Sequence, residues 1–257
     1  MIYSKALLNK MKSLKKLINL AILIPVYNEE KNISQVIKKC ASYRLDIIVV
    51  DDGSTDRTAK VVKKLKQSNK YPLIFLQHPK NKGKGAALKT GLQYVMEKGY
   101  QGVITIDGDA QHDPQEIKKF LKMIAREKPD LIIGSRFQNH QGMPFIRLAT
   151  NYITSWIISG LAGKKVEDVQ SGFRYISHKV IKNIELRTRN FDTEPELILK
   201  ACWLNYQVKN IPISTIYHED SVSEVNKFTD TLKFFRLVIK SLAWRRKIRP
   251  RKNIFID

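Results

Sequence analysis

Residues 20–55 read LAILIPVYNEEKNISQVIKKCASYRLDIIVVDDGST, in which two apolar runs flank a segment of helical periodicity. The runs, 20–26 and 46–50, have the length of strands, and each ends at polar residues. A strand that is apolar along its whole length is typically buried on both faces, as in a parallel sheet. This strand–helix–strand stretch therefore predicts an α/β fold.

The same alternation continues along the chain. Further apolar runs at 73–76, 102–106 and 131–133 are separated by segments of helical periodicity, one of them at about 85–98. Beyond residue 136 we predict a helix at 144–163, a strand at 170–176, a helix at 194–205, a strand at 206–216 and a basic amphipathic helix at 228–247. Together these elements predict a mostly parallel, Rossmann-like sheet covered by helices on both faces.

Polar residues follow three of the predicted strands. They are Tyr27 and Glu29, Asp51 and Asp52, and Asp107 and Asp109. Ligands of such sheets bind beyond the carboxyl ends of the strands, so these residues predict a binding site there. The alternative, that the carboxylates only stabilise turns, explains less well why they follow three separate strands.

The segment Asp107-Gly108-Asp109 carries the sharpest chemical signal. In an extended segment its two carboxylates project to the same side, and Gly108 would allow a ligand to approach closely. Two carboxylates with positions left open for phosphate oxygens suit Mg²⁺ or Mn²⁺ bound to a diphosphate. A calcium hand is excluded, because the twelfth residue from Asp107 is Lys118 and not glutamate. The alternative is a polar turn before the next helix, for which Asp113 alone would suffice.

Two other segments could complete a diphosphate site. The segment 81–87 (NKGKGAA) is glycine-rich but matches neither the dinucleotide fingerprint nor the Walker A motif. Lys84 could hold a phosphate at the start of the helix that follows, and a tight turn is an equally good interpretation. Arg136 follows the fifth strand and could neutralise charge on a leaving group, unless it is an ordinary surface arginine.

Positive charge is concentrated at the two ends of the chain. Of 257 residues, 46 are Lys or Arg and 24 are Asp or Glu, which gives a formal net charge of +22. Outside the windows 5–16 and 227–252, 31 basic and 23 acidic residues remain. An anionic partner is therefore favoured. We expect an anionic membrane surface and no nucleic acid, because the basic ends have few aromatic residues to stack on bases and no recognition motif.

Targeting and redox signals point to the cytoplasm. No apolar core of 7–15 residues precedes residue 20, so no secretory signal is predicted. The apolar tract 148–163 is shorter than the ~20 residues that span a bilayer. Cys40 and Cys202 occur singly, which is typical of buried thiols in a reducing compartment. We expect a cytoplasmic protein that associates peripherally with the cytoplasmic face of the membrane.

Six segments occur in an order and spacing that identify a family resemblance. They are 25–29, 50–54, 81–85, 107–109, 134–136 and 170–174. Through them the chain resembles family 2 glycosyltransferases of the GT-A fold over about residues 20–240. Within that family it is most similar to the branch of dolichol-phosphate mannosyltransferases and polyprenyl-phosphate glycosyltransferases.

The resemblance implies a role for each matching residue. Positions that hold the nucleobase and ribose of a nucleotide-sugar are matched by Pro25, Tyr27, Glu29, Val50 and Asp52. Positions of the metal ion and diphosphate are matched by Asp107, Asp109 and Gln111, and a further donor contact is matched by Arg136. With Lys84 and Gly108, these residues make up the predicted donor site, and Mg²⁺ or Mn²⁺ is the predicted cofactor.

The resemblance also implies inverting transfer of a sugar from a GDP- or UDP-sugar. We expect a polyprenyl or dolichyl phosphate acceptor, with Asp109 and Arg136 as catalytic residues and Arg174 as a ligand of the acceptor phosphate. The alternative is a hydroxyl acceptor, in polysaccharide or glycolipid synthesis, which requires a general base. Asp168 and the carboxylates at 192–196 are the candidate bases, unless they serve only a turn and a helix start.

The ends of the chain are expected to bind the membrane. We divide the chain into a basic N-terminal segment (1–19), a GT-A domain (20–226) and a basic amphipathic helix with its tail (227–257). Apolar anchors near Trp156 and in 228–247, with cations close by, predict contact with an anionic interface, unless they only pack on the domain. Relatives often have a basic residue in the loop before the last helix, and 218–224 has none, although Lys227 could substitute. A membrane-anchoring partner subunit would replace the transmembrane helices that many relatives carry.

Overall fold

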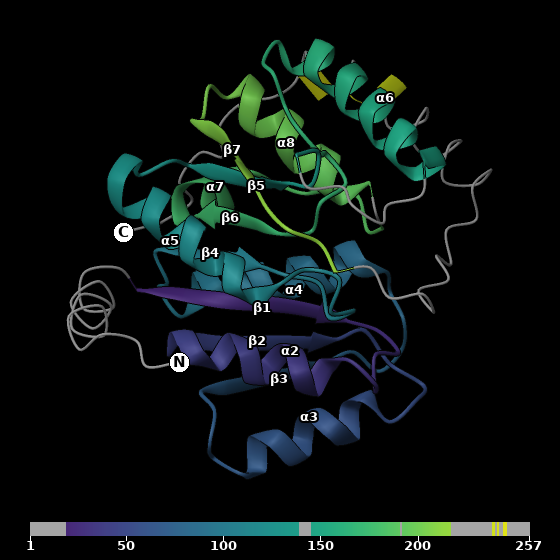
Figure 1. Cartoon of the computed structure of the whole chain (residues 1–257), viewed down its shortest axis with the longest axis vertical. Helices are drawn as coiled ribbons and strands as arrows, with labels where there is room; N and C mark the ends of the chain where they lie inside the picture. Colours follow the sequence, from purple (N-terminus) through teal and green to yellow (C-terminus); the bar gives the residue numbers. More distant parts are fainter. Residues whose placement is uncertain are drawn as a thin grey trace, which may run out of the picture.

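Apolar strands form one seven-stranded sheet through the centre of the molecule (Figure 1). The computed structural model describes residues 19–138, 145–190, 192–216, and 238, 239, 241, 244 and 245. The strands are β1 (Leu20–Val26), β2 (Asp46–Asp51), β3 (Leu73–Gln77), β4 (Gly102–Thr105), β5 (Leu131–Ser135), β6 (Arg174–Ser177) and β7 (Val208–Pro212). Every residue of β1 is buried, as expected for a strand covered on both faces.

The strand order is β3-β2-β1-β4-β6-β5-β7. Neighbouring strands are parallel except for β6, which runs antiparallel to both β4 and β5. The predicted mostly parallel sheet is therefore confirmed. From β1 the chain continues on one side to β2 and β3 and later returns to the other side at β4, so the strand order reverses between β1 and β4. Such a reversal leaves a crevice for ligands beyond the carboxyl ends of the strands.

Helices cover both faces of the sheet. They are α2 (Ile33–Cys40), α3 (Thr58–Gln67), α4 (Lys84–Glu97), α5 (Ile117–Glu127), α6 (Phe145–Ala162), α7 (His178–Asn183) and α8 (Thr193–Trp203), with 3₁₀ turns at Ala41–Tyr43 and Pro114–Glu116. One apolar core contains side chains of α2, α3 and α5. The other contains side chains of α4, α6, α7 and α8. This arrangement confirms the predicted helical layers.

A few elements differ from the sequence-based expectation. The segment of helical periodicity after the second strand begins as a helix only at Thr58, because the Ser54 hydroxyl donates to Asp51 and accepts from Asn28 N–H and does not cap a helix. The strand predicted at 170–176 is shorter, since 170–173 form a loop. The short helix α7 was not predicted, because a six-residue helix carries little periodic signal.

Two predicted segments lie largely outside the described residues. These are the basic segment 1–19, of which Asn19 is described, and the C-terminal helix and tail 227–257; the loop 218–226 also lies outside them. Within 227–257, the five described residues are helical. The Lys200 ammonium of α8 lies 5.0 Å from the centroid of the Trp244 ring, so this part of the predicted helix contacts the domain.

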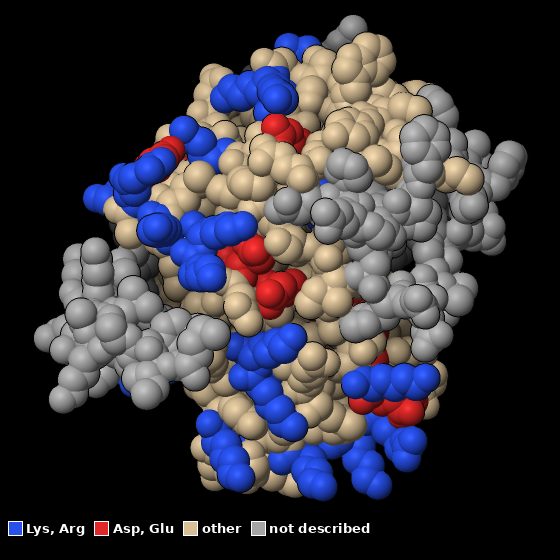
Figure 2. All heavy atoms as spheres, in the orientation of Figure 1, with Lys and Arg blue, Asp and Glu red and all other residues tan. Residues whose placement is uncertain are grey.

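Lysines gather on one layer of the domain, as Figure 2 shows for the side that carries α2, α3 and α5. These three helices contain ten Lys and Arg residues and one acidic residue, Glu127. The amphipathic helices bury their apolar side chains against the sheet and leave the lysines in solvent. The positive charge of the molecule is therefore not confined to the chain ends that the sequence count emphasised. In the described part of the chain, no helix combines the length and apolarity needed to cross a bilayer.

Replacing Phe120 by alanine is expected to destabilise the fold strongly. Its ring is fully buried and stacks on Phe173 with centroids 4.6 Å apart. Loss of a buried phenyl ring costs about 3–5 kcal/mol. The free energy of unfolding, measured by chemical denaturation, checks this. Lys122→Ala, at an exposed position of the same helix, should change it by less than about 0.5 kcal/mol; equal effects of the two variants would contradict the packing described.

Candidate active site

Hydrogen bonds join the loops after β1 and β2 at the carboxyl edge of the sheet. Asn28 Oδ1 accepts a hydrogen bond from Thr55 N–H at 2.8 Å, and Glu29 N–H donates to Thr58 Oγ1 at 2.7 Å. Tyr27 directly precedes Asn28 and has 39% of its surface exposed. The predicted donor residues Tyr27 and Glu29 thus lie at the edge where ligands bind in such folds.

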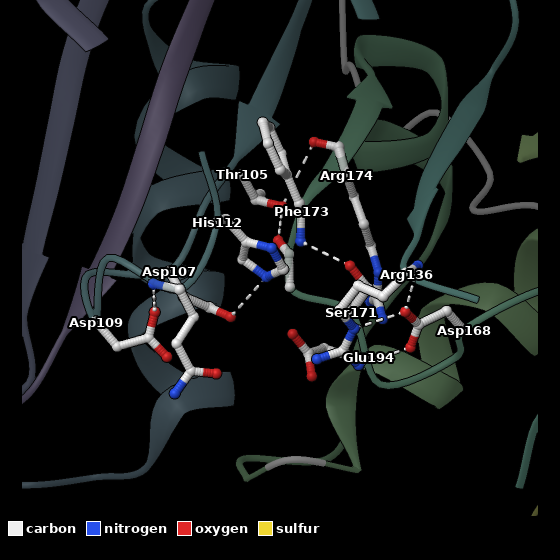
Figure 3. Close-up of polar contacts among 12 residues, drawn as sticks. Thr105, Asp107, Asp109, His112, Arg136, Asp168, Ser171, Phe173, Arg174 and Glu194 are labelled. Carbon is white, nitrogen blue, oxygen red and sulfur yellow. Dashed lines mark hydrogen bonds and ion pairs between the residues drawn. The ribbon is translucent and has the colours of Figure 1, made fainter. Parts of the chain in front are cut away.

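Asp107 and Asp109 follow β4 at the same edge (Figure 3). The helical turn after them is capped by Asp113, whose carboxylate accepts from Gln115 N–H at 3.0 Å. The turn therefore does not require the other two carboxylates. Asp109 accepts from the Gln111 N–H at 2.9 Å. Gly108 packs closely on Val26, since a Cβ at this position would lie 3.1 Å from the Val26 side chain, and the approach of a ligand at Gly108 stays a prediction.

Asp107 is the best-paired carboxylate of the site. Its Oδ1 lies 2.7 Å from Lys84 Nζ, and its Oδ2 lies 3.5 Å from His112 Nε2. Burial alone would raise the pKa of Asp107, but the charge of Lys84 and the contact with His112 outweigh burial and hold the pKa well below its usual range. Asp107 is therefore ionised at neutral pH.

The neighbouring carboxylates are less well compensated. Burial, followed by repulsion from Asp107, raises the pKa of Asp109. Burial also raises the pKa of Glu29; the hydrogen bond from Asn32 opposes this, and the charges of Asp109 and Asp107 add to it. Three carboxylates that repel one another leave a concentration of negative charge at the end of β4. A cation bound there would relieve the repulsion.

The site suits a divalent cation whose coordination shell is completed by atoms of the substrate. Among the described residues, no three His, Cys, Asp or Glu side chains converge closely enough to hold a metal ion. Mg²⁺ commonly uses one or two carboxylates and completes its shell with water and substrate phosphates. The under-compensated carboxylate of Asp109 next to Asp107 fits that pattern.

Lys84 also contacts a residue from a distant part of the chain. Its Nζ lies 3.1 Å from Glu194 Oε1, at the start of α8. Burial by itself would lower the pKa of Lys84, but the charges of Asp107 and Glu194 outweigh it and raise the pKa above its usual value. Lys84 therefore stays charged between two carboxylates. The sequence presented Glu194 only as one of several candidate bases.

Arg136 and Asp168 form a buried bidentate ion pair. Arg136 Nε donates to Asp168 Oδ2 and Nη2 donates to Oδ1, both at 2.6 Å, and the Arg136 N–H donates to Oδ2 at 2.9 Å. Asp168 is fully buried and has a φ of 47°, in the left-handed region. Both its oxygens are directed at Arg136, so the general-base role predicted for Asp168 does not fit this geometry. The ion pair with Asp168 instead fixes the position of the Arg136 side chain.

Arg174 is almost completely enclosed by the protein. The side chain is 1% exposed, and its Nη2 donates to the Val169 carbonyl at 2.6 Å. Its Nε and Nη1 have no hydrogen-bond partner among the described residues. Arg174 lines a small pocket with Lys84, Asp107 and Glu194. It therefore belongs to the charged floor of the site, and its role as an acceptor ligand stays a prediction.

The predicted nucleobase residues are also more enclosed than expected. The Val50 side chain is fully buried in the core, so only its backbone is available to a ligand. Asp52 Oδ1 lies 2.6 Å from His78 Nδ1 and accepts from Lys82 N–H, and Oδ2 accepts from Gly83 N–H at 2.7 Å. In this structure Asp52 holds the loop that leads to Lys84. Pro25 is buried and lines the same pocket as Lys84.

Sequence reasoning missed His78, His112 and the role of Gly172. Each histidine occurs singly, without a spacing to other residues that identifies a site. His78 contacts Asp52, which is distant in sequence, and His112 contacts Asp107, which is near it in sequence but forms no recognisable motif with it. Gly172 lies against Asp107: a Cβ at this position would be 2.4 Å from both carboxylate oxygens. The glycine of the segment 170–174 was visible in the sequence, but its contact with Asp107 depends on the pairing of β4 with β6.

Comparison with known proteins identifies the family. Residues 21–184 match the family model described as glycosyl transferase family 2. The chain belongs to glycosyltransferase family 2. It is 34% identical over 240 residues to the UDP-N-acetylglucosamine–dolichyl-phosphate N-acetylglucosaminyltransferase of Methanococcus voltae, an alignment that covers 86% of this chain and 96% of the relative. It is 26% identical to the polyprenol monophosphomannose synthase of Mycolicibacterium smegmatis, with 80% of each chain covered.

The fold of this family 2 glycosyltransferase is GT-A. A solved structure of glucosyl-3-phosphoglycerate synthase from Mycobacterium tuberculosis, in complex with Mn²⁺, uridine diphosphate and glucosyl-3-phosphoglycerate, aligns with a TM-score of 0.69. The alignment covers 98% of this chain and 88% of that chain, at 16% identity. The predicted family, enzyme class and fold are therefore confirmed, and the relatives include enzymes named for dolichyl phosphate and polyprenol, as predicted.

Gly172→Ala is expected to reduce sugar transfer about 100-fold while the fold is kept. The added methyl group must displace the Asp107 carboxylate, and a displacement of about 1 Å at a reacting centre can cost that much. Steady-state rates and a melting curve check this. Gly160→Ala is the control, because a Cβ there has nothing within 4 Å. A Gly172→Ala enzyme with the normal rate would show that the position of Asp107 is unimportant.

Proposed function

We propose that this enzyme transfers a sugar, with inversion, from a UDP- or GDP-sugar to a polyprenyl phosphate at a membrane surface. The names of the M. voltae and M. smegmatis relatives, which specify dolichyl phosphate and polyprenol, support the acceptor. The M. voltae relative is named for a UDP-sugar donor, and the structural relative binds Mn²⁺ and uridine diphosphate. The clustered carboxylates at the end of β4 support a metal–diphosphate site in this chain.

One observation carries the choice of a phosphate acceptor: three of the carboxylates predicted as bases, Asp168, Glu194 and Glu196, are already engaged in ion pairs. Asp168 is paired with Arg136. Glu196 is fully buried, pairs with Lys200 and accepts from the backbone N–H groups of Arg187 and Thr188. A hydroxyl acceptor must lose a proton and needs a free base. A polyprenyl phosphate is already ionised at neutral pH and needs none.

The reaction then requires only positioning and charge. A bond forms between an oxygen of the acceptor phosphate and the anomeric carbon, as the bond from that carbon to the diphosphate breaks. The electron pair of the broken bond leaves with the diphosphate. Asp107 and Asp109, with Gln111 beside them, would hold Mg²⁺ or Mn²⁺, which stabilises the negative charge of the departing diphosphate.

Arg136 supplies a second positive charge. Its guanidinium is almost completely buried, and the bidentate contact with Asp168 fixes its orientation. A fixed charge in a site shielded from water stabilises developing negative charge more than a mobile, solvated charge does. We assign Arg136 to the leaving diphosphate and Asp168 to the positioning of Arg136.

Helix α6 provides the contact with the membrane. Over residues 151–156 its amphipathicity is inverted: Asn151, Thr154 and Ser155 are buried, whereas Ile153 and Trp156 are 58% and 78% exposed. Large apolar side chains that stay in water mark an interaction surface. An apolar helix face beside a strongly basic protein suits an anionic lipid interface. Two free, buried cysteines agree with the cytoplasmic face of that membrane.

The membrane helix is connected to the active site. Ser159 Oγ accepts from Val166 N–H at 2.9 Å, and Ser155 Oγ accepts from Val169 N–H at 3.1 Å. These bonds hold the segment that contains Asp168. The polar face of α6 thus fixes the partner of Arg136, while the apolar face is available to lipid, which is where a polyprenyl phosphate resides.

Asp109→Asn is expected to reduce transfer to a polyprenyl phosphate at least about 100-fold, because it removes a negative charge that the metal ion needs. Product formation from UDP- and GDP-sugars with Mn²⁺ or Mg²⁺ is the measurement. Asp113→Asn is the matched control: asparagine caps a helix as well as aspartate, so the rate should be kept.

The same assay separates the two acceptor classes. The free polyprenol, which differs from the substrate only in the missing phosphate, should not be glycosylated. Transfer to the polyprenol and not to its phosphate would replace our proposal by the hydroxyl-acceptor alternative.

Replacing both Ile153 and Trp156 by serine is expected to weaken binding to vesicles with anionic lipids at least about tenfold. Each apolar side chain contributes about 1.5–3 kcal/mol when it leaves water completely. Cosedimentation at ~150 mM salt, where long-range attraction is screened, is the measurement. Gln67→Ser, at an exposed position of α3, is the control. Unchanged binding of the double variant would rule out α6 as the membrane contact.

A further inference from the structure

Lys84 is placed where a metal ion would have to compete with it. Its ammonium group lies 2.7 Å from Asp107 Oδ1, on one of the two carboxylates that we assign to the metal. The side chain is largely enclosed, with 23% of its surface exposed, so solvent screens its charge only in part. Without metal, Lys84 neutralises Asp107.

The position of Lys84 is fixed by the packing of two helix starts. A Cβ at Gly85 would lie 1.9 Å from Thr193 Oγ1, and a Cβ at Gly83 would lie 2.2 Å from Asn190 Oδ1. The glycines on both sides of Lys84 therefore allow the start of α4 to touch the start of α8. Glu194, on α8, also contacts the ammonium, at 3.1 Å. Lys84 therefore still has an ion-pair partner, Glu194, when Asp107 binds another cation.

These contacts have a consequence for the order of binding. A divalent cation at Asp107 and Asp109 places two positive charges close to the fixed charge of Lys84, and like charges at short range repel strongly in a partly buried site. A nucleoside diphosphate brings negative charge that attracts both cations. The repulsion therefore opposes the metal ion alone and is offset once the diphosphate is present.

We propose that Lys84, supported by Glu194, is the resident counter-ion of Asp107 and couples binding of the divalent cation to arrival of the nucleoside diphosphate. This inference rests on the proposed donor site and adds a thermodynamic link to it. The coupling is reciprocal: the diphosphate tightens metal binding by the same factor by which the metal tightens diphosphate binding. The enzyme therefore binds the free metal ion weakly until the nucleoside diphosphate of the donor is present. A lysine that served only as a phosphate ligand would not affect the affinity for metal alone.

The test is a Mn²⁺ titration of the full chain, in which the free ion is measured by electron paramagnetic resonance, without nucleotide and with UDP or GDP. For the wild type we expect at least about tenfold tighter binding with one of the nucleotides, equivalent to about 1.4 kcal/mol. Lys84→Met should bind Mn²⁺ alone about tenfold more tightly than the wild type and lose most of the coupling. Lys84→Arg keeps the charge and should keep the coupling.

Two further variants complete the experiment. Lys60→Met removes one positive charge from an exposed position of α3 and should leave Mn²⁺ binding unchanged. Glu194→Gln removes the ion pair between Glu194 and Lys84 and should reduce the coupling, although Lys84 can still neutralise Asp107. Circular dichroism of each variant verifies that it is folded, and Lys84→Gln provides a second neutral variant if Lys84→Met is not.

The outcomes separate this inference from the proposed function. If neutral variants at Lys84 bind Mn²⁺ alone no more tightly than the wild type, or if Lys60→Met has the same effect, the counter-ion role is wrong and the transferase assignment stands. If the wild type binds Mn²⁺ neither alone nor with UDP or GDP, the metal–diphosphate site is wrong, and the inference is overturned with it.

Discussion

The negative charge of Asp107 is the constraint around which the site is arranged. A carboxylate that is largely enclosed is costly unless it is paired. Lys84 at the start of α4 and His112 after the same strand contact Asp107, and Gly172, which has no side chain, leaves room for it. Glu194 in turn balances Lys84. Satisfying one carboxylate therefore brings the starts of α4 and α8 to the end of β4 and defines the shape of the cleft floor.

The two halves of the sheet contribute different chemistry. The parallel strands β1, β2 and β4 end in the residues that we assign to the donor, whereas the antiparallel strand β6 and helix α8 supply buried charges that position other groups. Arg136, directly after β5, and Asp168, in the segment before β6, form the clearest buried pair of this half, because their contact is bidentate and almost completely enclosed. Buried pairs of this kind tolerate little rearrangement, since removing one partner leaves an uncompensated charge. This half of the site is thus rigid.

Helix α6 joins this rigid site to the proposed membrane surface. Its buried serines bind the segment before β6, and its exposed face carries Ile153 and Trp156. Helices α2 and α3, which carry six lysines, lie at the other end of the molecule from α6 (Figure 1). Attraction by these lysines acts over a distance, whereas the apolar contact acts only at the surface. The charge can thus bring the protein to an anionic membrane, and α6 can orient the cleft there.

The sequence by itself determined the α/β fold, the carboxylates at the strand ends and the family, because buried strands and glycine-rich turns are local patterns. Asp107, Asp109, Lys84 and Arg136 were also predicted from the sequence as site residues; the structure places Lys84 against Asp107, and the functional roles of all four stay predictions. Only the tertiary structure decided what the remaining charges do: Asp168 is bound to Arg136, Arg174 is enclosed, and Glu194 supports Lys84. These roles depend on which groups meet after β4 has paired with β6. Burial and ion pairing arise from contacts between distant segments, which a local pattern does not encode.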